Sequence, residues 1–383
     1  MTLTVCAVTS TRADWGLMAP VLALLRDDPA FDLQLIVTGQ HLMPDAGDTA
    51  AMIAAEGFMA SATIDMKLAG DTPEAVTSAL ATGIDGLGKA FARLRPDLVL
   101  ILGDRYEILG AATAATLARI PIAHIAGGDL TEGAVDDAFR HAITKMSHLH
   151  FVTTDDAAQR VRQMGEDPTR VIVTGSPGLD RIRTTPLMDR TALFAAVGLP
   201  PLDRFLMVTF HPETLSADSR AACGEMLAAL HQLGPEVGLV FSGSNADVEG
   251  RAVGGMIADF VRSHPNAVLH ASLGSARYFS ALKHADAVVG NSSSGLYEAP
   301  SFGTPSVNIG DRQKGRVRAA SVIDVAARQA DIYRGLQRAM EMDGTGIVNP
   351  YGDGHAAEKI VAALKAVGGL GTLQKRFADF PKA

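Results

Sequence analysis

The chain has 383 residues, 47% of them hydrophobic, which is enough to bury more than one core, so we expect two domains of about 180 residues each. Its 34 Lys and Arg against 42 Asp and Glu give a formal charge of −8, which argues against a general nucleic-acid binder because such proteins carry a basic surplus. The two cysteines, Cys6 and Cys223, have no Cys or His partner at metal-ligand spacing. We therefore expect buried thiols, with no disulfide framework and no metal site.

The start of the chain lacks the basic segment and apolar core of a signal peptide. No stretch reaches the roughly 18 consecutive apolar residues that a membrane span needs. The expectation is a cytoplasmic protein that does not bind membranes.

The first predicted element is a buried parallel strand at residues 3–9, rich in β-branched and apolar side chains. A loop at 10–16 and an amphipathic helix from Leu17 follow it. A strand, loop and helix in this order can hold an anion on free backbone amides, although the Gly-x-Gly-x-x-Gly pattern of dinucleotide sites is absent. Arg12 in this loop is a candidate phosphate ligand, with a structural ion pair as the alternative.

The same alternation of strands and helices continues to about residue 174, which is the βαβ pattern of a doubly wound α/β sheet. Strands are predicted at 32–38, 62–66, 97–102, 121–125, 148–153 and 171–174, and helices at 73–94, 106–120 and 135–147. His148 and His150 share one face of a strand, but no third ligand accompanies them, so metal binding is not expected.

Charged residues follow two neighbouring strands of this first series at their carboxyl ends. Asp104 and Arg105 follow one strand, and Asp129, Asp136 and Arg140 follow the other. In an open parallel sheet that edge is where ligands bind. Asp136 and Arg140 lie four residues apart on one face of a predicted helix, so we expect the guanidinium to pair with this carboxylate and hold it ionised. Each residue alone could be a solvated loop charge, but the cluster as a whole favours a catalytic site.

The pattern loosens around residues 180–204, which we interpret as a domain junction. A second alternating series follows, with strands predicted at 205–209, 237–242, 267–271, 287–290 and 305–309. We therefore expect a domain at 1–180, a second at 181–360, and a C-terminal helix and tail at 361–383 that could pack back on the first. Two Rossmann-like, doubly wound domains facing a cleft are the two-domain (GT-B) glycosyltransferase architecture.

The second series carries further polar clusters at its strand ends. His211 has the side chain best matched to proton transfer near neutral pH, and Asn245 follows the next strand. Residues 291–295 place consecutive small residues at a helix start, which favours an anion such as a phosphate, and Glu298 could bond two ribose hydroxyls. The alternatives are a histidine satisfied by the backbone and an ordinary serine-capped helix.

These motifs, taken in order, resemble those of the hydrolysing UDP-N-acetylglucosamine 2-epimerases of sialic and nonulosonic acid biosynthesis. The resemblance rests on these strings: Thr-Arg-Ala-Asp-Trp-Gly at 11–16, Gly-Asp-Arg-Tyr-Glu at 103–107, Asp-Asp-Ala-Phe-Arg-His-Ala-Ile-Thr-Lys at 136–145, Phe-His-Pro-Glu-Thr at 210–214, Gly-Ser-Asn-Ala-Asp at 243–247, Gly-Asn-Ser-Ser-Ser-Gly at 290–295, Asn-Ile-Gly-Asp-Arg-Gln-Lys-Gly-Arg at 308–316 and Asn-Pro-Tyr-Gly-Asp-Gly at 349–354.

The resemblance implies conversion of UDP-N-acetylglucosamine and water to N-acetylmannosamine and UDP, without a cofactor or metal, by a homodimer. UDP leaves C1 as C2 loses its proton, and water then adds to the glycal-type intermediate with inversion at C2. The implied catalytic residues are Asp104, Asp129, Asp136, His211 and Arg140. The implied UDP and substrate ligands are Arg12, Arg105, Asn245, Phe279, Ser292, Ser293, Ser294, Gly295, Glu298 and Arg316.

Two departures from the family pattern stand out. Several relatives carry a catalytic Glu where this chain has Ala126, and Asp129, three residues later, is the candidate replacement. Trp15 stands where Tyr is more usual, which we expect to be a change in packing.

Four alternatives remain open on the sequence. The first is the same reaction on a UDP-2,4-diacetamido-trideoxyhexose of a legionaminic-type pathway, which differs only at C4 and C6 of the sugar. The others are a non-hydrolysing 2-epimerase, a glycosyltransferase of the same architecture, and a nucleotide-sugar sensor without catalysis.

Overall fold

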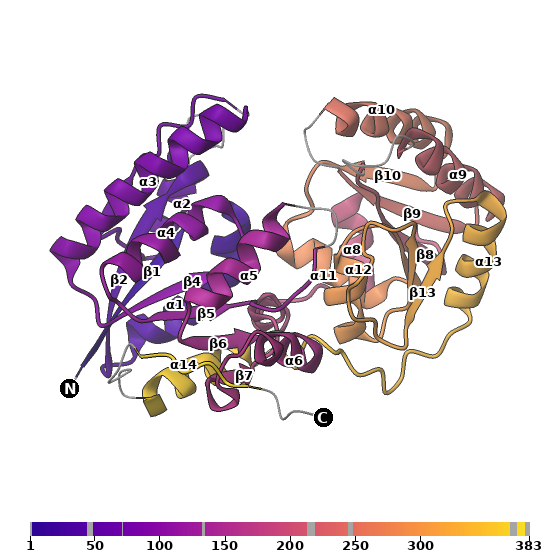
Figure 1. Cartoon of the computed structure of the whole chain (residues 1–383). Helices are drawn as coiled ribbons and strands as arrows, with labels where there is room; N and C mark the ends of the chain where they lie inside the picture. Colours follow the sequence, from indigo (N-terminus) through magenta and orange to yellow (C-terminus); the bar gives the residue numbers. More distant parts are fainter. Residues whose placement is uncertain are drawn as a thin grey trace. The chain divides into compact units, whose positions relative to one another are not determined.

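The computed structural model describes residues 2–43, 49–70, 72–131, 135–212, 219–243, 248–367 and 374–379. The chain forms two compact units, one of Met1–Arg181 with Tyr351–Ala383 and the other of Ile182–Pro350. Each unit is a parallel sheet with helices on both faces (Figure 1), so the predicted α/β class with two doubly wound sheets is confirmed. The chain re-enters the first unit at Tyr351, ten residues before the tail expected from 361.

The sheet of the first unit has the strand order β3-β2-β1-β4-β5-β6-β7, and all its strands are parallel. The strands are β1 Leu3–Thr9, β2 Phe31–Thr38, β3 Ala62–Ile64, β4 Leu98–Leu102, β5 Ile122–Ile125, β6 Leu149–Val152 and β7 Val171–Val173. The order reverses between β1 and β4, and in sheets of this kind ligands bind outside the carboxyl ends at such a switch point. Asp104 lies two residues beyond the end of β4.

Helices cover both faces of this sheet with separate apolar cores. They are α1 Arg12–Asp27, α2 Thr49–Ala55, α3 Pro73–Leu94, α4 Tyr106–Leu117, α5 Asp136–Met146, α6 Asp155–Gln163, α7 Asp180–Thr184 and α14 Ala356–Val367. One core joins α1, α2 and α14 to the sheet, and the other joins α3, α4 and α5. Because both faces are buried, the strands read as continuous apolar runs rather than alternating ones.

The first helix begins earlier than the sequence suggested. The loop expected at 10–16 is largely the first turn of α1, which starts at Arg12. Thr11 caps the Asp14 amide, and the Asp14 side chain bonds back to the Thr11 amide, which completes a capping box. Residues 12–16 are therefore helical and not a loop, and Arg12 is exposed at the start of the helix.

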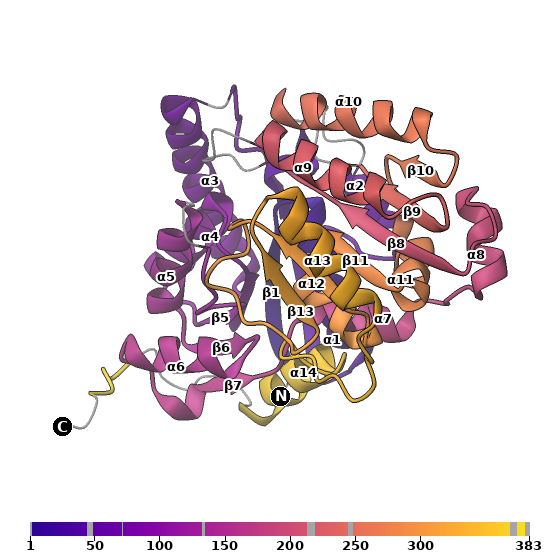
Figure 2. The same ribbon diagram turned by 90° about the vertical axis from the view of Figure 1, so that its right-hand side faces the viewer.

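The helix α14 belongs to the first unit although 169 residues of the second unit precede its return, as the bounds 182–350 show. Ile360 and Leu364 of α14 belong to the same core as Leu22 of α1, and both ribbon views show the two helices side by side (Figures 1 and 2). Asp180, which is buried, accepts hydrogen bonds from the amides of Ala356 and Ala357 at 2.9 and 2.6 Å. The amides that begin α14 are thereby satisfied.

A buried carboxylate ties the C-terminal residues to the end of α5. Glu166 accepts hydrogen bonds from Lys145 at 2.6 Å and Lys375 at 2.7 Å, and it lies 2.9 Å from His150 Nε2. Burial alone would raise the pKa of Glu166, but the hydrogen bonds from His150, Lys145 and Lys375 outweigh it and lower the pKa to about 2. We call these four residues the Glu166 cluster.

The sheet of the second unit is parallel and has the order β10-β9-β8-β11-β12-β13. Its strands are β8 Arg204–Thr209, β9 Val237–Ser242, β10 Ala267–His270, β11 Ala287–Gly290, β12 Ser306–Ile309 and β13 Val322–Val325, and its helices are α8 Arg190–Val197, α9 Ser219–Gln232, α10 Val248–Ser263, α11 Gly274–His284, α12 Ser294–Tyr297 and α13 Gln329–Met340. One core packs α9, α10 and α13 on the sheet, and the other packs α8 and α11 on its opposite face. The strand order reverses between β8 and β11. His211 lies just beyond the end of β8, and Asn291 directly follows β11.

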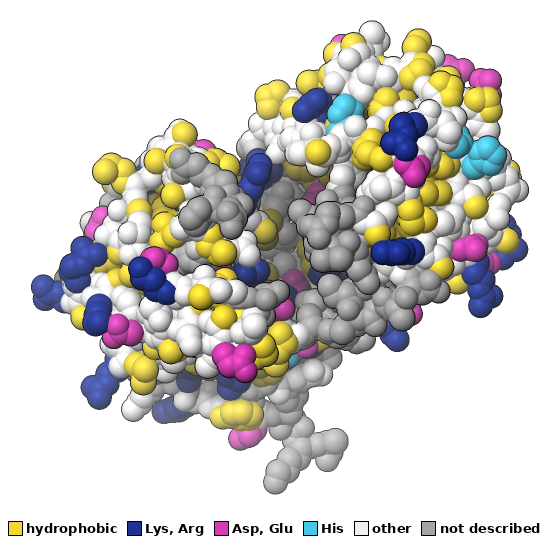
Figure 3. Space-filling model, turned by 90° about the horizontal axis from the view of Figure 1, so that it is seen from above, with side chains coloured by type: hydrophobic (Ala, Val, Ile, Leu, Met, Phe, Trp, Pro, Cys, Tyr) yellow, Lys and Arg dark blue, Asp and Glu magenta, His cyan; other side chains and the backbone are white. Residues whose placement is uncertain are grey.

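Within the described residues, no helix is long and apolar enough to cross a membrane. Both cysteines are buried and unbridged, as expected. On the part of the surface that Figure 3 describes, Lys and Arg side chains are scattered among acidic and hydrophobic ones.

Candidate active site

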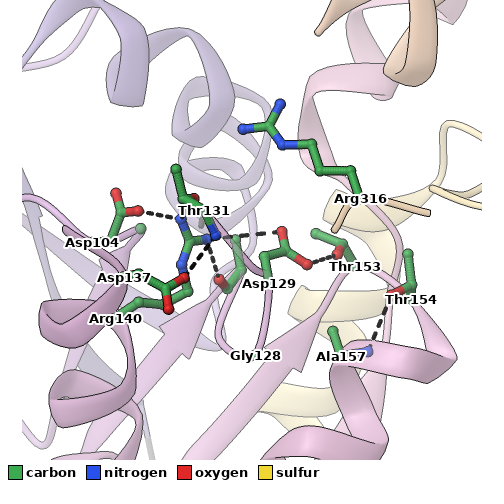
Figure 4. Close-up of polar contacts among 12 residues, drawn as sticks. Asp104, Gly128, Asp129, Thr131, Asp137, Arg140, Thr153, Thr154, Ala157 and Arg316 are labelled. Atoms are coloured by element: carbon green, nitrogen blue, oxygen red, sulfur yellow. Dashed lines mark hydrogen bonds and ion pairs between the residues drawn. The ribbon is translucent and has the colours of Figure 1, made fainter. Parts of the chain in front are cut away.

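Asp104 is placed by the end of β4. Gly103 has a φ of +84°, which turns the chain out of the strand, and its amide donates to Ile125 O at 3.0 Å on the neighbouring strand. The Asp104 carboxylate pairs with the Arg140 guanidinium of α5 (Figure 4). The predicted cluster therefore begins with a carboxylate and a cation that come from two different elements.

Arg140 is the centre of this cluster. Its side chain is only 9% exposed, and it donates to Ala126 O at 3.1 Å and to Thr131 Oγ1 at 3.0 Å in addition to Asp104. Its Nη1 atom lies 3.9 Å from an oxygen of Asp129. One buried guanidinium thus faces two carboxylates, as Figure 4 shows.

Asp129 is brought to Arg140 by a tight turn after β5. Gly128 has a φ of +78°, and a Cβ at this position would lie 2.4 Å from Ala157 O, so only glycine fits. The Asp129 carboxylate accepts a hydrogen bond from Thr153 Oγ1 at 2.5 Å. The turn and this bond direct the other carboxylate oxygen towards Arg140.

The electrostatics of the cluster favour proton exchange at Asp104. Burial raises the pKa of this carboxyl, the positive charge of Arg140 opposes the rise, and the negative charge of Asp136 adds to it, so that the pKa lies above its usual value. A carboxylate with a raised pKa accepts a proton more readily near neutral pH, which suits a general base.

Asp136 begins α5, one turn before Arg140, and the sequence suggested that the two side chains would pair at this i, i+4 spacing. That part of the expectation is wrong. Among the described residues, the carboxylates paired with Arg140 are Asp104 and Asp129. The guanidinium reaches towards the strand-end loops instead of running along its own helix, while Asp136 acts on Asp104 through its charge.

Ala126, where the family resemblance implied a Glu, adopts a left-handed backbone with a φ of +63°. Its carbonyl accepts from Arg140, and its methyl group packs against the apolar core that contains α1 and α14. The carboxylate beside Arg140 after β5 is therefore supplied by Asp129.

Two more arginines lie at the carboxyl ends of β1 and β4, on either side of the switch point. Arg12 is exposed at the start of α1. Arg105 is 37% exposed, and Glu107, which is fully buried, holds its guanidinium through contacts of 3.1 and 2.9 Å.

Trp15, the unusual residue of the first loop, is buried, and its Nε1 donates to Glu56 at 3.0 Å. Its ring belongs to the core.

In the second unit, His211 and Asn291 are joined across the switch point between β8 and β11. The His211 amide donates to Asn291 Oδ1 and the Asn291 side-chain amide donates to His211 O, both at 2.7 Å. Gly290 before Asn291 has a φ of +135°, and a Cβ there would lie 1.9 Å from Thr209 O. This glycine lets the two strand-end loops approach each other.

The serine-rich segment follows at once. Ser292 and Ser293 are half-buried, whereas Ser294 and Gly295 are buried in the first turn of α12. The helix expected here is a single turn, Ser294–Tyr297, followed by a 3-10 turn. Because the helix dipole grows with the number of aligned peptides, its contribution to binding an anion is smaller than the sequence implied, and the serine hydroxyls matter more.

Glu298 follows this turn and has an unused acceptor. Its Oε2 atom is buried and makes no hydrogen bond within the described part of the chain. Burial raises the pKa of Glu298, while Ser294 and the charge of Arg316 oppose the rise. A buried oxygen without a partner costs free energy unless a ligand supplies a donor. Arg316 also lies over the Tyr297 ring, 5.6 Å from its centroid.

Phe279, one of the implied UDP ligands, is 8% exposed and packs against Phe302 in a core of the second unit. Its neighbour Tyr278 instead reaches the serine segment and donates to Ser294 Oγ. Asn245 lies outside the described residues.

Sequence reasoning missed three polar residues that hold the site together: Thr131, Thr153 and Tyr278. Each lies within or beside a predicted strand or motif, but an uncharged threonine or tyrosine is not recognisable as a site residue from the sequence alone. Only the fold shows that Thr131 and Thr153 bond the buried ions.

A cavity of about 850 Å³ opens near the carboxyl ends of β8, β12 and β13 in the second unit. Its lining includes Phe210 beside His211 and the polar side chains of Asp311, Lys314, Arg318 and Asp324.

The chain matches known proteins over nearly its whole length. A family model described as UDP-N-acetylglucosamine 2-epimerase covers residues 23–365. The chain is 37% identical to the GDP/UDP-N,N'-diacetylbacillosamine 2-epimerase (hydrolyzing) of Campylobacter jejuni, over 85% of each chain. It is 35% identical to polysialic acid biosynthesis protein P7 of Escherichia coli, over 97% of this chain and 96% of the relative.

A further relative, the UDP-N,N'-diacetylbacillosamine 2-epimerase (hydrolyzing) of Legionella pneumophila, is 35% identical over 94% of this chain and 95% of its own length. Among solved structures, the UDP-GlcNAc 2-epimerase from Neisseria meningitidis bound to UDP-GlcNAc is similar with a TM-score of 0.81 and 20% identity, over 95% of this chain and 100% of the other. That similarity shows the fold. The chain belongs to the UDP-N-acetylglucosamine 2-epimerase family.

Proposed function

We propose that this protein is a hydrolysing UDP-sugar 2-epimerase that converts UDP-N-acetylglucosamine and water to N-acetylmannosamine and UDP. The observation that carries the proposal is the pair of carboxylates, Asp104 and Asp129, that face one buried guanidinium of Arg140. Removal and return of a proton at carbon need such groups, and the family membership supplies the substrate class.

The reaction is an elimination followed by a hydration. A carboxylate of the Asp104, Asp129 and Asp136 set removes the proton at C2, and the C1–O bond breaks with its electron pair leaving on UDP. Water then adds its hydroxyl to C1 of the glycal, and a proton returns to C2 on the opposite face. The raised pKa of Asp104 suits the removal step.

In this proposal the second unit holds UDP. Ser292 and Ser293 bind the diphosphate, and the unpartnered oxygen of Glu298 accepts hydrogen bonds from the ribose. Arg12, Arg105, His211 and Arg316 stabilise the negative charge that grows on the departing diphosphate.

The second candidate substrate is UDP-N,N'-diacetylbacillosamine. The names of the Campylobacter jejuni and Legionella pneumophila relatives favour it. The reaction at C1 and C2 is the same, so the carboxylate cluster serves either sugar.

Separate incubations with the two UDP-sugars test the proposal. We expect one to give free sugar with inverted C2, together with one UDP for each sugar released. UDP release with retained C2 configuration indicates simple hydrolysis, and a UDP-linked product indicates a non-hydrolysing epimerase. Substrate that is consumed only when an acceptor is added indicates a glycosyltransferase. Each of these three results contradicts the proposal.

A further inference from the structure

A histidine that the proposed reaction does not use lies at the meeting point of the segments that carry the cluster. His124 is on β5 and is fully buried. Its Nε2 atom lies 2.8 Å from Gly103 O, and its Nδ1 atom lies 3.3 Å from Thr144 Oγ1 of α5. One imidazole therefore contacts both the end of β4 and the helix α5.

The burial of the imidazole and its contacts define its protonation state and its tautomer. Burial lowers the pKa of His124 to about 3, and the charges of His150, Arg140 and His141 act in the same direction, so the ring is neutral at neutral pH. A carbonyl oxygen only accepts, so the single ring proton is on Nε2 and is donated to Gly103. Nδ1 is then an unprotonated nitrogen that lies 3.3 Å from Thr144 Oγ1, whose single proton is donated to Arg140 O.

The first contact fixes the peptide that precedes Asp104. The Gly103 amide donates to Ile125 O at 3.0 Å, and the Gly103 carbonyl accepts from His124. Residues of β5 therefore bind both the amide and the carbonyl of Gly103. These two hydrogen bonds set the direction in which the next residue, Asp104, leaves the sheet.

The second contact reaches α5 at the level of Arg140. Thr144 Oγ1 lies 2.9 Å from Arg140 O as well as beside the imidazole. The loop after β5 closes on the same pair, because a Cβ at Gly127 would lie 3.0 Å from His124 Nδ1 and 2.9 Å from Thr144 Oγ1. Asp129 follows two residues later.

We propose that His124 is a positioning residue that sets the spacing of Asp104, Asp129 and Arg140 by joining the three segments that carry them. This inference rests on the proposed function for its kinetic readout alone. Nε2 donates to Gly103 O, and the ring is neutral and fully buried, so His124 takes no part in proton transfer to the sugar.

Two substitutions separate the role of the bond from that of the ring. His124→Leu removes the donor to Gly103, whereas His124→Gln keeps a neutral N–H donor at a similar reach. We expect Leu to lower kcat by about a hundredfold, the cost of misplacing reacting groups by about 1 Å. Gln should recover at least about tenfold of that loss, and the affinity for UDP should stay unchanged in both variants.

His284→Leu is the matched control. His284 makes the same type of contact, from Nε2 to a backbone carbonyl, with Met188 O at 2.9 Å in the second unit. The kcat of His284→Leu should stay near that of the wild type. His124→Leu with near-normal kcat, or His124→Gln as impaired as His124→Leu, would overturn the inference. The same holds if His284→Leu is as impaired as His124→Leu.

Two measurements apply even if a variant fails to fold or the wild type acts on neither UDP-sugar. Nitrogen-15 NMR of the wild-type ring should show the neutral Nε2–H tautomer from pH 6 to 9, and a titration in that range, or an Nδ1–H tautomer, would reject the inference. A crystal structure of Thr144→Val should show the Arg140 and Asp104 side chains displaced relative to the wild type, and unmoved side chains would also reject it. A wild type inactive on all UDP-sugars would instead reject the proposed function.

Discussion

The Asp129 carboxylate accepts a hydrogen bond of 2.5 Å from the Thr153 hydroxyl, and this bond holds it beside Arg140. Asparagine at 129 can keep the bond from Thr153 but lacks the negative charge. We expect Asp129→Asn to lower turnover about as severely as Asp104→Asn, by on the order of a hundredfold or more.

Steady-state kinetics of both variants, with circular dichroism to verify folding, tests this prediction. Thr153→Val serves as the comparison, since it keeps the charge and loosens only its position, and its loss of turnover should be smaller. A loss below about tenfold for Asp129→Asn, or about 1.4 kcal/mol of barrier, assigns Asp129 a structural role in its loop.

Glu298 offers a buried, unpartnered acceptor in the second unit. If the ribose hydroxyls occupy it, Glu298→Ala should weaken UDP binding by about 1–3 kcal/mol, because the hydrogen bonds between the ribose and the carboxylate are lost. Isothermal titration calorimetry with UDP measures this, with Glu341→Ala, an exposed glutamate of the same unit, as the control. Unchanged UDP affinity removes the ribose assignment.

The negative charge of Asp136 raises the pKa of Asp104, and the part of the chain that the structure describes shows no ion pair between Asp136 and Arg140. We therefore expect Asp136→Asn to impair proton transfer and to leave UDP binding nearly unchanged. Turnover should fall by on the order of a hundredfold or more, with the UDP dissociation constant within about twofold of the wild type.

Heavy water gives an independent test of the elimination. The wild-type product should carry one deuterium at C2, because the original proton is lost before solvent returns another. A product that keeps its C2 hydrogen excludes elimination, and with it the proposed role of Asp136.

The Glu166 cluster makes the stability of the protein depend on pH in the acid range. The pKa of Glu166 is lowered from 4.5 to about 2 in the folded protein, so the carboxylate stabilises the fold above about pH 4.5. This stabilisation is lost as the pH falls from 4.5 towards 2, because the unfolded chain takes up the proton first.

Urea unfolding of Glu166→Gln and the wild type at pH 7 and pH 3 checks this. At pH 7 the variant should be less stable by about 1–3 kcal/mol, because Lys145 and Lys375 lose a charged acceptor, and the difference should shrink at pH 3. Asp353→Asn removes the exposed pair with Lys359 and should change the free energy of unfolding by less than about 1 kcal/mol. A constant difference at both pH values contradicts the linkage to Glu166.

Much of the fold could be predicted because buried parallel strands are short apolar runs bounded by turn residues. The predicted strands at 237–242 and 287–290 and the predicted helix at 73–94 match β9, β11 and α3. The edge strand β13 was missed, since Val322–Val325 includes the exposed Asp324 and lacks the apolar signal of a central strand. The capping box of α1 was missed because Ser10 and Thr11 were interpreted as loop residues.

The charged residues of the site could be predicted from the sequence, but the partners that they contact in the fold could not. Asp104, Asp129 and Arg140 were expected near one sheet edge, and the structure brings them together. Sequence spacing favoured Asp136 as the partner of Arg140, but the guanidinium reached instead for the strand-end loops, a tertiary contact that no local pattern encodes. The same limit applies to Tyr278, whose adjacent Phe279 had seemed the better candidate.

The return of the chain at Tyr351 has a consequence for how the protein is made. The helix α1 packs against α14, whose Ile360 and Leu364 share a core with Leu22 and Leu25 and leave the ribosome only after the whole of 182–350. The second unit can therefore complete its fold while the first still lacks a helix of its core, an inversion of the usual N-terminal-first order. During synthesis the nascent first half exposes apolar surface of that core, which is the kind of surface that chaperones bind.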